Sequence, residues 1–73
     1  MAIVMDVFNS AFGSQVRALQ QFKRFSQEEV AHRVGINATN LSGIERGLRN
    51  PALKNIRKIA LALGVQTTEL FEL

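Results

Sequence analysis

The side chains in this sequence that are suited to chemistry are mainly basic, and they are concentrated in one stretch. All nine lysines and arginines lie between positions 17 and 58, where Glu28, Glu29 and Glu45 are the only acids. Nine positive charges against three negative ones give this stretch a net charge of +6. Such a stretch is either a solvated surface or the contact surface for a polyanion such as a nucleic acid, and charge alone leaves both open.

Catalytic and metal-binding side chains are scarce. The absence of cysteine excludes disulfides, thiolate zinc sites and cysteine nucleophiles. His32 is the only histidine and Asp6 the only aspartate, and the sequence contains no carboxylate pair, nucleophile–base arrangement or phosphate-binding loop. We therefore expect no enzymatic activity, no metal, no cofactor and no small-molecule ligand.

Length and hydropathy predict one small globular domain over residues 1–73. The sequence is 47% hydrophobic and 21% charged, which is too apolar for a disordered chain. A domain this short buries little surface alone, so self-association is expected to support it.

The apolar segment 1–8 contains Asp6 and is too short for a signal peptide, and no stretch approaches the ~18 apolar residues of a membrane span. We expect a cytoplasmic protein without membrane contact.

The elements that must position the basic residues are all helical. Apolar residues recur every three or four positions, and no stretch alternates as a strand would. The expected helices cover 6–23, 27–34, 38–46 and 51–63, followed by a last helical turn that opens at 66 or 67. Asn50 and Pro51 are expected to be the cap and the first residue of the fourth helix. The sequence thus predicts an all-α fold of five helices.

The segment from Gln27 to Arg46 meets the steric requirements of a helix-turn-helix. Ser26 and Glu29 have the spacing of a capping box, and Ala31 is small enough for a close helix crossing. Gly35 permits the positive φ that a short turn needs, and Asn37 is a suitable cap for the next helix. The residues expected to point inward are Val30, Val34, Ile36, Leu41 and Ile44.

The helix expected over 38–46 has one apolar side and one small polar side. At about 100° per residue, five residues fill an arc of roughly 140° that holds no large apolar side chain. These are Ala38, Thr39, Ser42, Gly43 and Arg46. An ordinary solvated face would more often carry lysine and glutamate, whereas this one can approach base edges in a major groove closely.

The motifs resemble those of the phage-repressor-like (Cro/cI, XRE-type) DNA-binding family. The matching runs are residues 26–31 (SQEEVA), 34–36 (VGI), 44–47 (IERG), 49–51 (RNP) and 59–65, and the resemblance covers about residues 11–72. Within the family, residues 41–46 (LSGIER) look most like the controller proteins of restriction–modification systems. The resemblance implies a lambda-repressor-like fold and a small homodimeric transcription regulator. Its partner would be double-stranded DNA, bound through the major groove at a palindromic operator.

The resemblance also implies which residues bind DNA. Gln27 would contact a phosphate at a helix terminus, and the base-facing positions would be Ala38, Thr39 and Gly43. Asn40 and Ser42 would flank them, Asn37 belongs to the same predicted surface, and Arg46, Arg49 and Asn50 would hold the DNA backbone or reach bases.

The sequence departs from the family pattern at two positions. Gln20 stands where the family usually has an arginine that pairs with the equivalent of Glu45. Glu45 would then accept a single hydrogen bond from Gln20, or would use Arg46 or Arg49 instead. Arg24 replaces the usual glycine before the second helix, so the first helix is expected to end differently.

The C-terminal apolar residues are the expected dimer contacts, because they are too few to form a core of their own. These are Val65, Leu70, Phe71 and Leu73. The alternative function is an antitoxin that binds a toxin protein and binds DNA secondarily.

Overall fold

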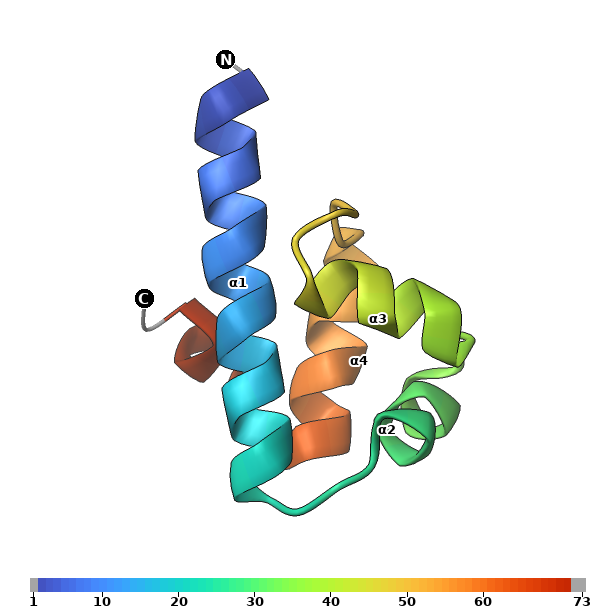
Figure 1. Cartoon of the computed structure of the whole chain (residues 1–73). Helices are drawn as coiled ribbons and strands as arrows, with labels where there is room; N and C mark the ends of the chain where they lie inside the picture. The colour runs from blue at the N-terminus through green and yellow to red at the C-terminus, as the bar shows by residue number, and fades with distance from the viewer. Residues whose placement is uncertain (1, 72–73) are drawn as a thin grey trace.

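The structure, a computed structural model, describes the backbone of residues 2–71 and the side chains of residues 7–71. The elements are α1 (Ala2–Phe22), α2 (Gln27–Val34), α3 (Ala38–Glu45), α4 (Leu53–Leu63) and the 3₁₀ helix η1 (Thr67–Phe71) (Figure 1). No strand occurs within residues 2–71, which confirms the all-α fold. The fifth expected helix is a 3₁₀ helix, so four of the five elements are α-helices.

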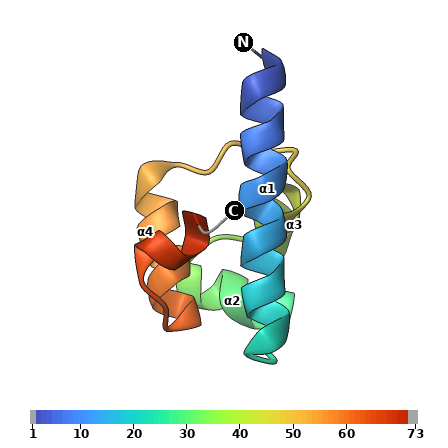
Figure 2. The ribbon, with the colours of Figure 1, turned by 90° about the vertical axis from the view of Figure 1, so that its left-hand side faces the viewer.

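The helices enclose one apolar core. α1 packs against α3 and η1, and α2 packs against both α3 and α4. In Figure 2, α4 lies to the left of α1 and α3 to the right, behind α1. The fully buried large side chains come from every element: Phe12, Val16, Val30, Leu41, Ile59, Leu63 and Leu70.

Gly13 is a point of close contact between α1 and α3. A Cβ atom at this position would lie 2.6 Å from the carbonyl oxygen of Glu45 and would also overlap the carbonyl oxygen of Ile44. Any side chain at residue 13 would therefore separate the two helices. The sequence shows Gly13 only as a glycine inside a helix and gives no sign of this contact.

The ends of α1 differ from the expected ones. The helix begins at Ala2, four residues before Asp6, and ends at Phe22. Arg24 adopts the left-handed conformation with φ 61°, and the Phe25 N–H donates to the carbonyl oxygen of Gln20 at 3.1 Å. This is the hydrogen bond of a Schellman ending, which usually places glycine at the left-handed residue. α1 therefore ends as it would with glycine, and the expectation of a different ending is wrong.

The expected start of α4 is also wrong. Ala52 is the N-cap residue, and its carbonyl oxygen accepts from the N–H groups of Asn55 at 2.9 Å and Ile56 at 3.0 Å. The hydrogen-bond ladder therefore begins after Asn50 and Pro51, and no side chain caps the helix.

Half of the expected capping box is present at the start of α2. The Ser26 side chain accepts from the N–H of Glu29 at 3.0 Å. The Glu29 carboxylate does not return to Ser26 but pairs with Arg33 at 3.2 Å, one turn along the helix. The Arg33 guanidinium also lies over the Phe25 ring, 4.5 Å from its centre. Arg33 therefore fixes α2 to the segment that precedes it.

Candidate nucleic-acid interface

The turn between α2 and α3 is built as the sequence predicts. Gly35 is left-handed with φ 85°, and Asn37 Oδ1 caps α3 by accepting from the N–H of Asn40 at 2.7 Å. Val30, Val34, Leu41 and Ile44 are buried and Ile36 is half-buried, which confirms the inward positions. The turn thus presents the opposite face of α3 to solvent.

The presented face of α3 is small and polar and has arginines at its end. Thr39 and Arg46 are exposed, while Ala38 and Ser42 are half-buried. A surface hollow joins this face to the loop that follows the helix. It is lined by Thr39, Ser42, Gly43, Arg46, Leu48 and Arg49.

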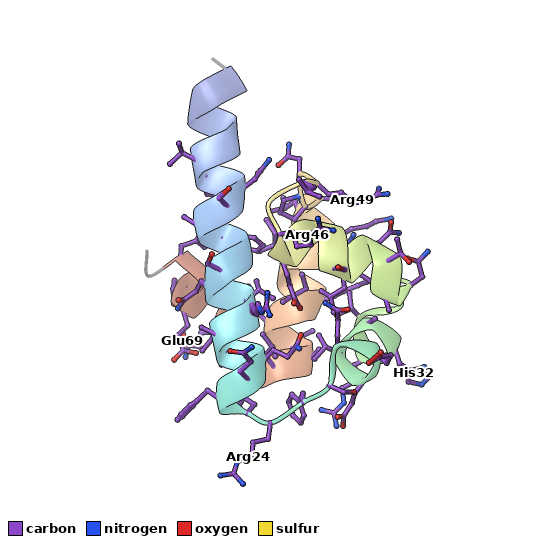
Figure 3. All side chains as sticks on the ribbon, in the orientation of Figure 1. Arg24, His32, Arg46, Arg49 and Glu69 are labelled. Atoms are coloured by element: carbon purple, nitrogen blue, oxygen red, sulfur yellow. The ribbon has the colours of Figure 1, made fainter. Side chains whose placement is uncertain are left out.

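The loop after α3 folds back onto the helix. The carbonyl oxygen of Gly43 accepts from the N–H groups of Leu48 at 2.8 Å and Arg49 at 3.3 Å. Arg49 and Asn50 are exposed and line a second hollow with Asn40 and Asn55. In Figure 3, Arg46 and Arg49 lie at the same end of α3. The predicted arginine contacts are therefore close in space to the predicted base-facing residues.

Gly43 does not lie on the solvent-facing surface where the sequence places it. The residue is buried, and the atoms nearest to a Cβ built on it all belong to the Arg49 side chain, at 2.8–3.0 Å. The surface over Gly43 is therefore provided by Arg49. The helical angle shows that Gly43 faces outward but not that a loop side chain covers it.

Gln27 joins the start of α2 to the end of α3. Its Nε2 donates to Oε1 of Glu45 at 3.2 Å, and Gln27 is half-buried. The expected partners Gln20, Arg46 and Arg49 make no hydrogen bond to Glu45 among the described side chains, and Gln27 is the residue that does. Two buried oxygen atoms, Oε1 of Gln20 and Oε2 of Glu45, have no hydrogen-bond partner among the described residues.

Burial controls the acidity of Glu45. The residue is only 6% exposed, and desolvation raises the pKa of its carboxyl above the usual value of 4.5. The hydrogen bond from Gln27 and the positive charge of Arg17 lower this pKa but do not cancel the effect of burial.

Some of the basic residues line hollows away from α3. Arg57 and Lys58 lie on α4, and the hollows that they line include residues of α2, α4 and the segment after α4, but none of α3. In Figure 3, His32 and Arg24 point away from the α3 end that carries Arg46 and Arg49. Arg46 and Arg49 are thus basic groups that share a hollow with Thr39.

The expected dimer residues have different environments. Leu70 is completely buried in the core and offers no surface to a partner, which makes it unsuitable as a dimer contact. Phe71 is 40% exposed and lies against the rings of Phe8 and Phe12, 6.0 and 5.5 Å between centres. Val65 is half-buried, and Leu73 lies outside the described residues.

Sequence reasoning missed Leu61, the most exposed large apolar residue among the described side chains at 81%. It lines two hollows, one with Arg33, Lys58 and Ala62 and the other with Arg57 and Val65 among others. The apolar stripe of α4 did not include it, so only its solvent exposure in the fold identifies it.

Residues 2–71 contain no helix that is long and apolar enough to cross a membrane. Within the described residues, no group of three or more histidine, aspartate or glutamate side chains is arranged to hold a metal ion.

Comparison with known proteins identifies relatives along most of the chain. Residues 23–70 match the helix-turn-helix family model. The control protein C.BamHI of Bacillus amyloliquefaciens is 45% identical over 62 residues, which cover 84% of this chain and 76% of the relative. C.MunI, a control protein of a Mycoplasma species, is 39% identical over 92% of each chain.

A similar protein of known structure is the restriction–modification controller protein C.AhdI of Aeromonas hydrophila. Its crystal structure superimposes with a TM-score of 0.87 at 40% sequence identity, covering 89% of this chain and 98% of the controller.

Proposed function

The chain belongs to the helix-turn-helix family of DNA-binding transcriptional regulators, and on this premise we propose that it is a homodimeric controller of a restriction–modification system. Similarity to three control proteins, two of them covered over more than nine tenths of their length, supports this function. Such a regulator would act in the cytoplasm, on the DNA that carries its genes.

The observation that carries the proposal is the face of α3. Buried Leu41 and Ile44 hold the helix on one side, and Thr39, Ser42 and Arg46 remain on the other. A face without large side chains allows a helix to enter a major groove, where hydroxyl and methyl groups reach base edges. Ala38, Asn37 and Asn40 would lie beside these contacts, at the N-terminal end of the helix.

Phosphate contacts would fix the helix in the groove. Gln27 stands at the start of α2, where free backbone N–H groups attract an anion. Asn50 extends from the loop that follows α3. Contacts from the start of α2 and from this loop would set the position of α3 without themselves selecting a sequence.

Dimerisation would place two copies of α3 on one operator. We assign the contact to Leu61 and Val65, which line one hollow, and to the exposed Phe71. Leu61 stands between two hollows, so a two-fold axis beside it would let Leu61 of each copy enter a hollow of the other. Leu61 thus takes the place that the sequence assigns to Leu70.

Selection of sites from a random duplex pool tests the proposed function. The wild-type protein should enrich two inverted half-sites about one helical turn apart, as two copies of α3 on a two-fold axis require. Enrichment of a single half-site would contradict the dimer, and absence of any enriched sequence would contradict sequence-specific binding. A cognate duplex should also raise the thermal midpoint of the protein more than a scrambled duplex does.

A further inference from the structure

The side chain of Arg49 crosses α3 at Gly43. A Cβ atom on Gly43 would lie 2.8 Å from Cδ, 2.9 Å from Nε and 3.0 Å from Cγ of Arg49. Carbon and nitrogen atoms cannot approach a Cβ this closely, so one of them must move. All three atoms belong to a flexible side chain, which means that a side chain at residue 43 would displace Arg49 and leave the backbone in place.

The backbone of Arg49 is held at the same point. Its N–H and that of Leu48 both donate to the carbonyl oxygen of Gly43, at 3.3 and 2.8 Å. Gly47 allows the loop to turn back with φ 77°. Backbone and side chain of Arg49 therefore both meet α3 at Gly43.

Arg49 belongs to both hollows beside α3. One hollow contains Thr39 and Ser42, and the other contains Asn40 and Asn50. Arg49 lines both. Its side chain thus borders the hollow that holds Thr39 and Ser42 as well as the one that holds Asn40, within the surface that the proposed function brings into the groove.

We infer that Gly43 is a positioning residue, which lets Arg49 lie across the groove-facing side of α3 and read a base edge there. This inference rests on the proposed function and adds the Gly43–Arg49 pair to its specificity-determining residues. Guanine is the expected base, because a guanidinium matches its O6 and N7 acceptors with two hydrogen bonds. Gly43 itself then makes no base contact.

The variant Gly43→Ala separates this role from a structural one. Alanine is the better helix former, so the thermal midpoint should stay the same or rise. The displaced Arg49 should nevertheless lose its base, so the affinity for the selected duplex should fall about tenfold. The affinity for random duplex DNA should change by less than about twofold, since the total charge is unchanged.

The experiment measures binding by fluorescence anisotropy at one salt concentration, with the duplex that the wild-type protein selects from a random pool. Gly43→Ala and Arg49→Ala should lose the preference for guanine at the same position of each half-site. In the double variant Gly43→Ala/Arg49→Ala, the affinity for the selected duplex should be no lower than in Arg49→Ala alone. In the control double variant Gly43→Ala/Arg46→Ala, the fold-losses of affinity from the two substitutions should multiply, because the atoms nearest to the new Cβ belong to Arg49.

Arg49→Lys provides a test that does not depend on whether the variant Gly43→Ala folds. It keeps the charge but not the planar pair of donors, so it should lose the guanine preference and keep the affinity for random DNA. Retained guanine preference in Arg49→Lys or in folded Gly43→Ala would overturn the inference, and so would an equal loss from Gly43→Ala with and without Arg49. If the wild-type protein selects no sequence, the proposed function fails and the inference fails with it.

Discussion

Gln27 at the start of α2 donates a hydrogen bond from Nε2 to Oε1 of Glu45 at the end of α3, across 3.2 Å. The residue proposed to contact a phosphate is thus the residue that ties the two helices of the helix-turn-helix together. Glu45 is buried and takes no other hydrogen bond from the described side chains. A phosphate held at Gln27 would therefore act on the element that fixes the direction of α3.

Gly13 should tolerate no side chain. Gly13→Ala would force the new Cβ against the carbonyl oxygens of Ile44 and Glu45, so α1 and α3 would have to separate. We expect a loss of about 1–3 kcal/mol or more in the free energy of unfolding, although alanine favours the helix itself. Urea unfolding followed by circular dichroism measures this loss. Ser14→Ala, at the exposed next residue, is the control and should change stability by less than about 0.5 kcal/mol.

Arg24→Gly should stabilise the fold. Arg24 has φ 61°, a conformation that costs a side chain roughly 1–2 kcal/mol relative to the right-handed one and costs glycine almost nothing. Part of this gain is lost because glycine is more flexible in the unfolded chain, so we expect a net gain of about 1 kcal/mol. Gln21→Gly, inside α1, should destabilise by a similar amount. If both glycines lower the thermal midpoint, Arg24 is not strained.

The positions of Gly13 and Gly43 show why part of the structure could not be predicted from the sequence. The turn at Gly35 and the cap at Asn37 depend on neighbours within four residues, so local patterns predict them. Gly13 and Gly43 each accommodate a group more than five residues away, and a single sequence shows only that a helix contains glycine.

The hydrogen-bond partner of Glu45 could not be predicted from the sequence for the same reason. The family pattern indicates Gln20 of α1 as the partner, whereas in the fold Gln27 of α2 donates the hydrogen bond. Apart from the covered Gly43, the face of α3 was predictable because helical angles decide which residues oppose Leu41 and Ile44. Whether an apolar residue is exposed, as Leu61 is and Leu70 is not, depends on packing between elements.

Glu45→Gln should stabilise the protein at neutral pH. Burial raises the pKa of Glu45, so the folded state binds the proton more tightly than the unfolded chain. The favourable contribution of protonated Glu45 is complete below the usual value of 4.5 and is lost as the pH rises through the higher value in the fold. Glutamine stays neutral, so the variant should have a higher thermal midpoint at pH 7, and the difference should shrink towards pH 4. A difference that is constant over this range would show that the charge of Glu45 is not the cause.

Leu61 should control self-association. Leu61→Lys places a charge where the second copy would lie, beside Arg57 and Lys58, and should raise the dimer dissociation constant at least tenfold. Sedimentation at micromolar concentrations measures the change. Leu53→Lys is the matched control, because Leu53 is 76% exposed on the same helix but lies outside both hollows. A dimer that tolerates Leu61→Lys and dissociates with Leu53→Lys would place the contact at the other end of α4.

The central claim is that α3 reads the bases while the start of α2 holds the backbone. Site selection from a random duplex pool by Thr39→Ala and Gln27→Ala, followed by affinity measurements on the selected and the random duplexes, tests this claim most directly. Thr39→Ala should cost roughly 1 kcal/mol at one base pair and relax the preference there, with the affinity for random DNA unchanged. Gln27→Ala should weaken binding to all duplexes about equally. If Gln27→Ala shifts the selected bases while Thr39→Ala leaves them as they are, α3 is not the reading helix and the account is wrong.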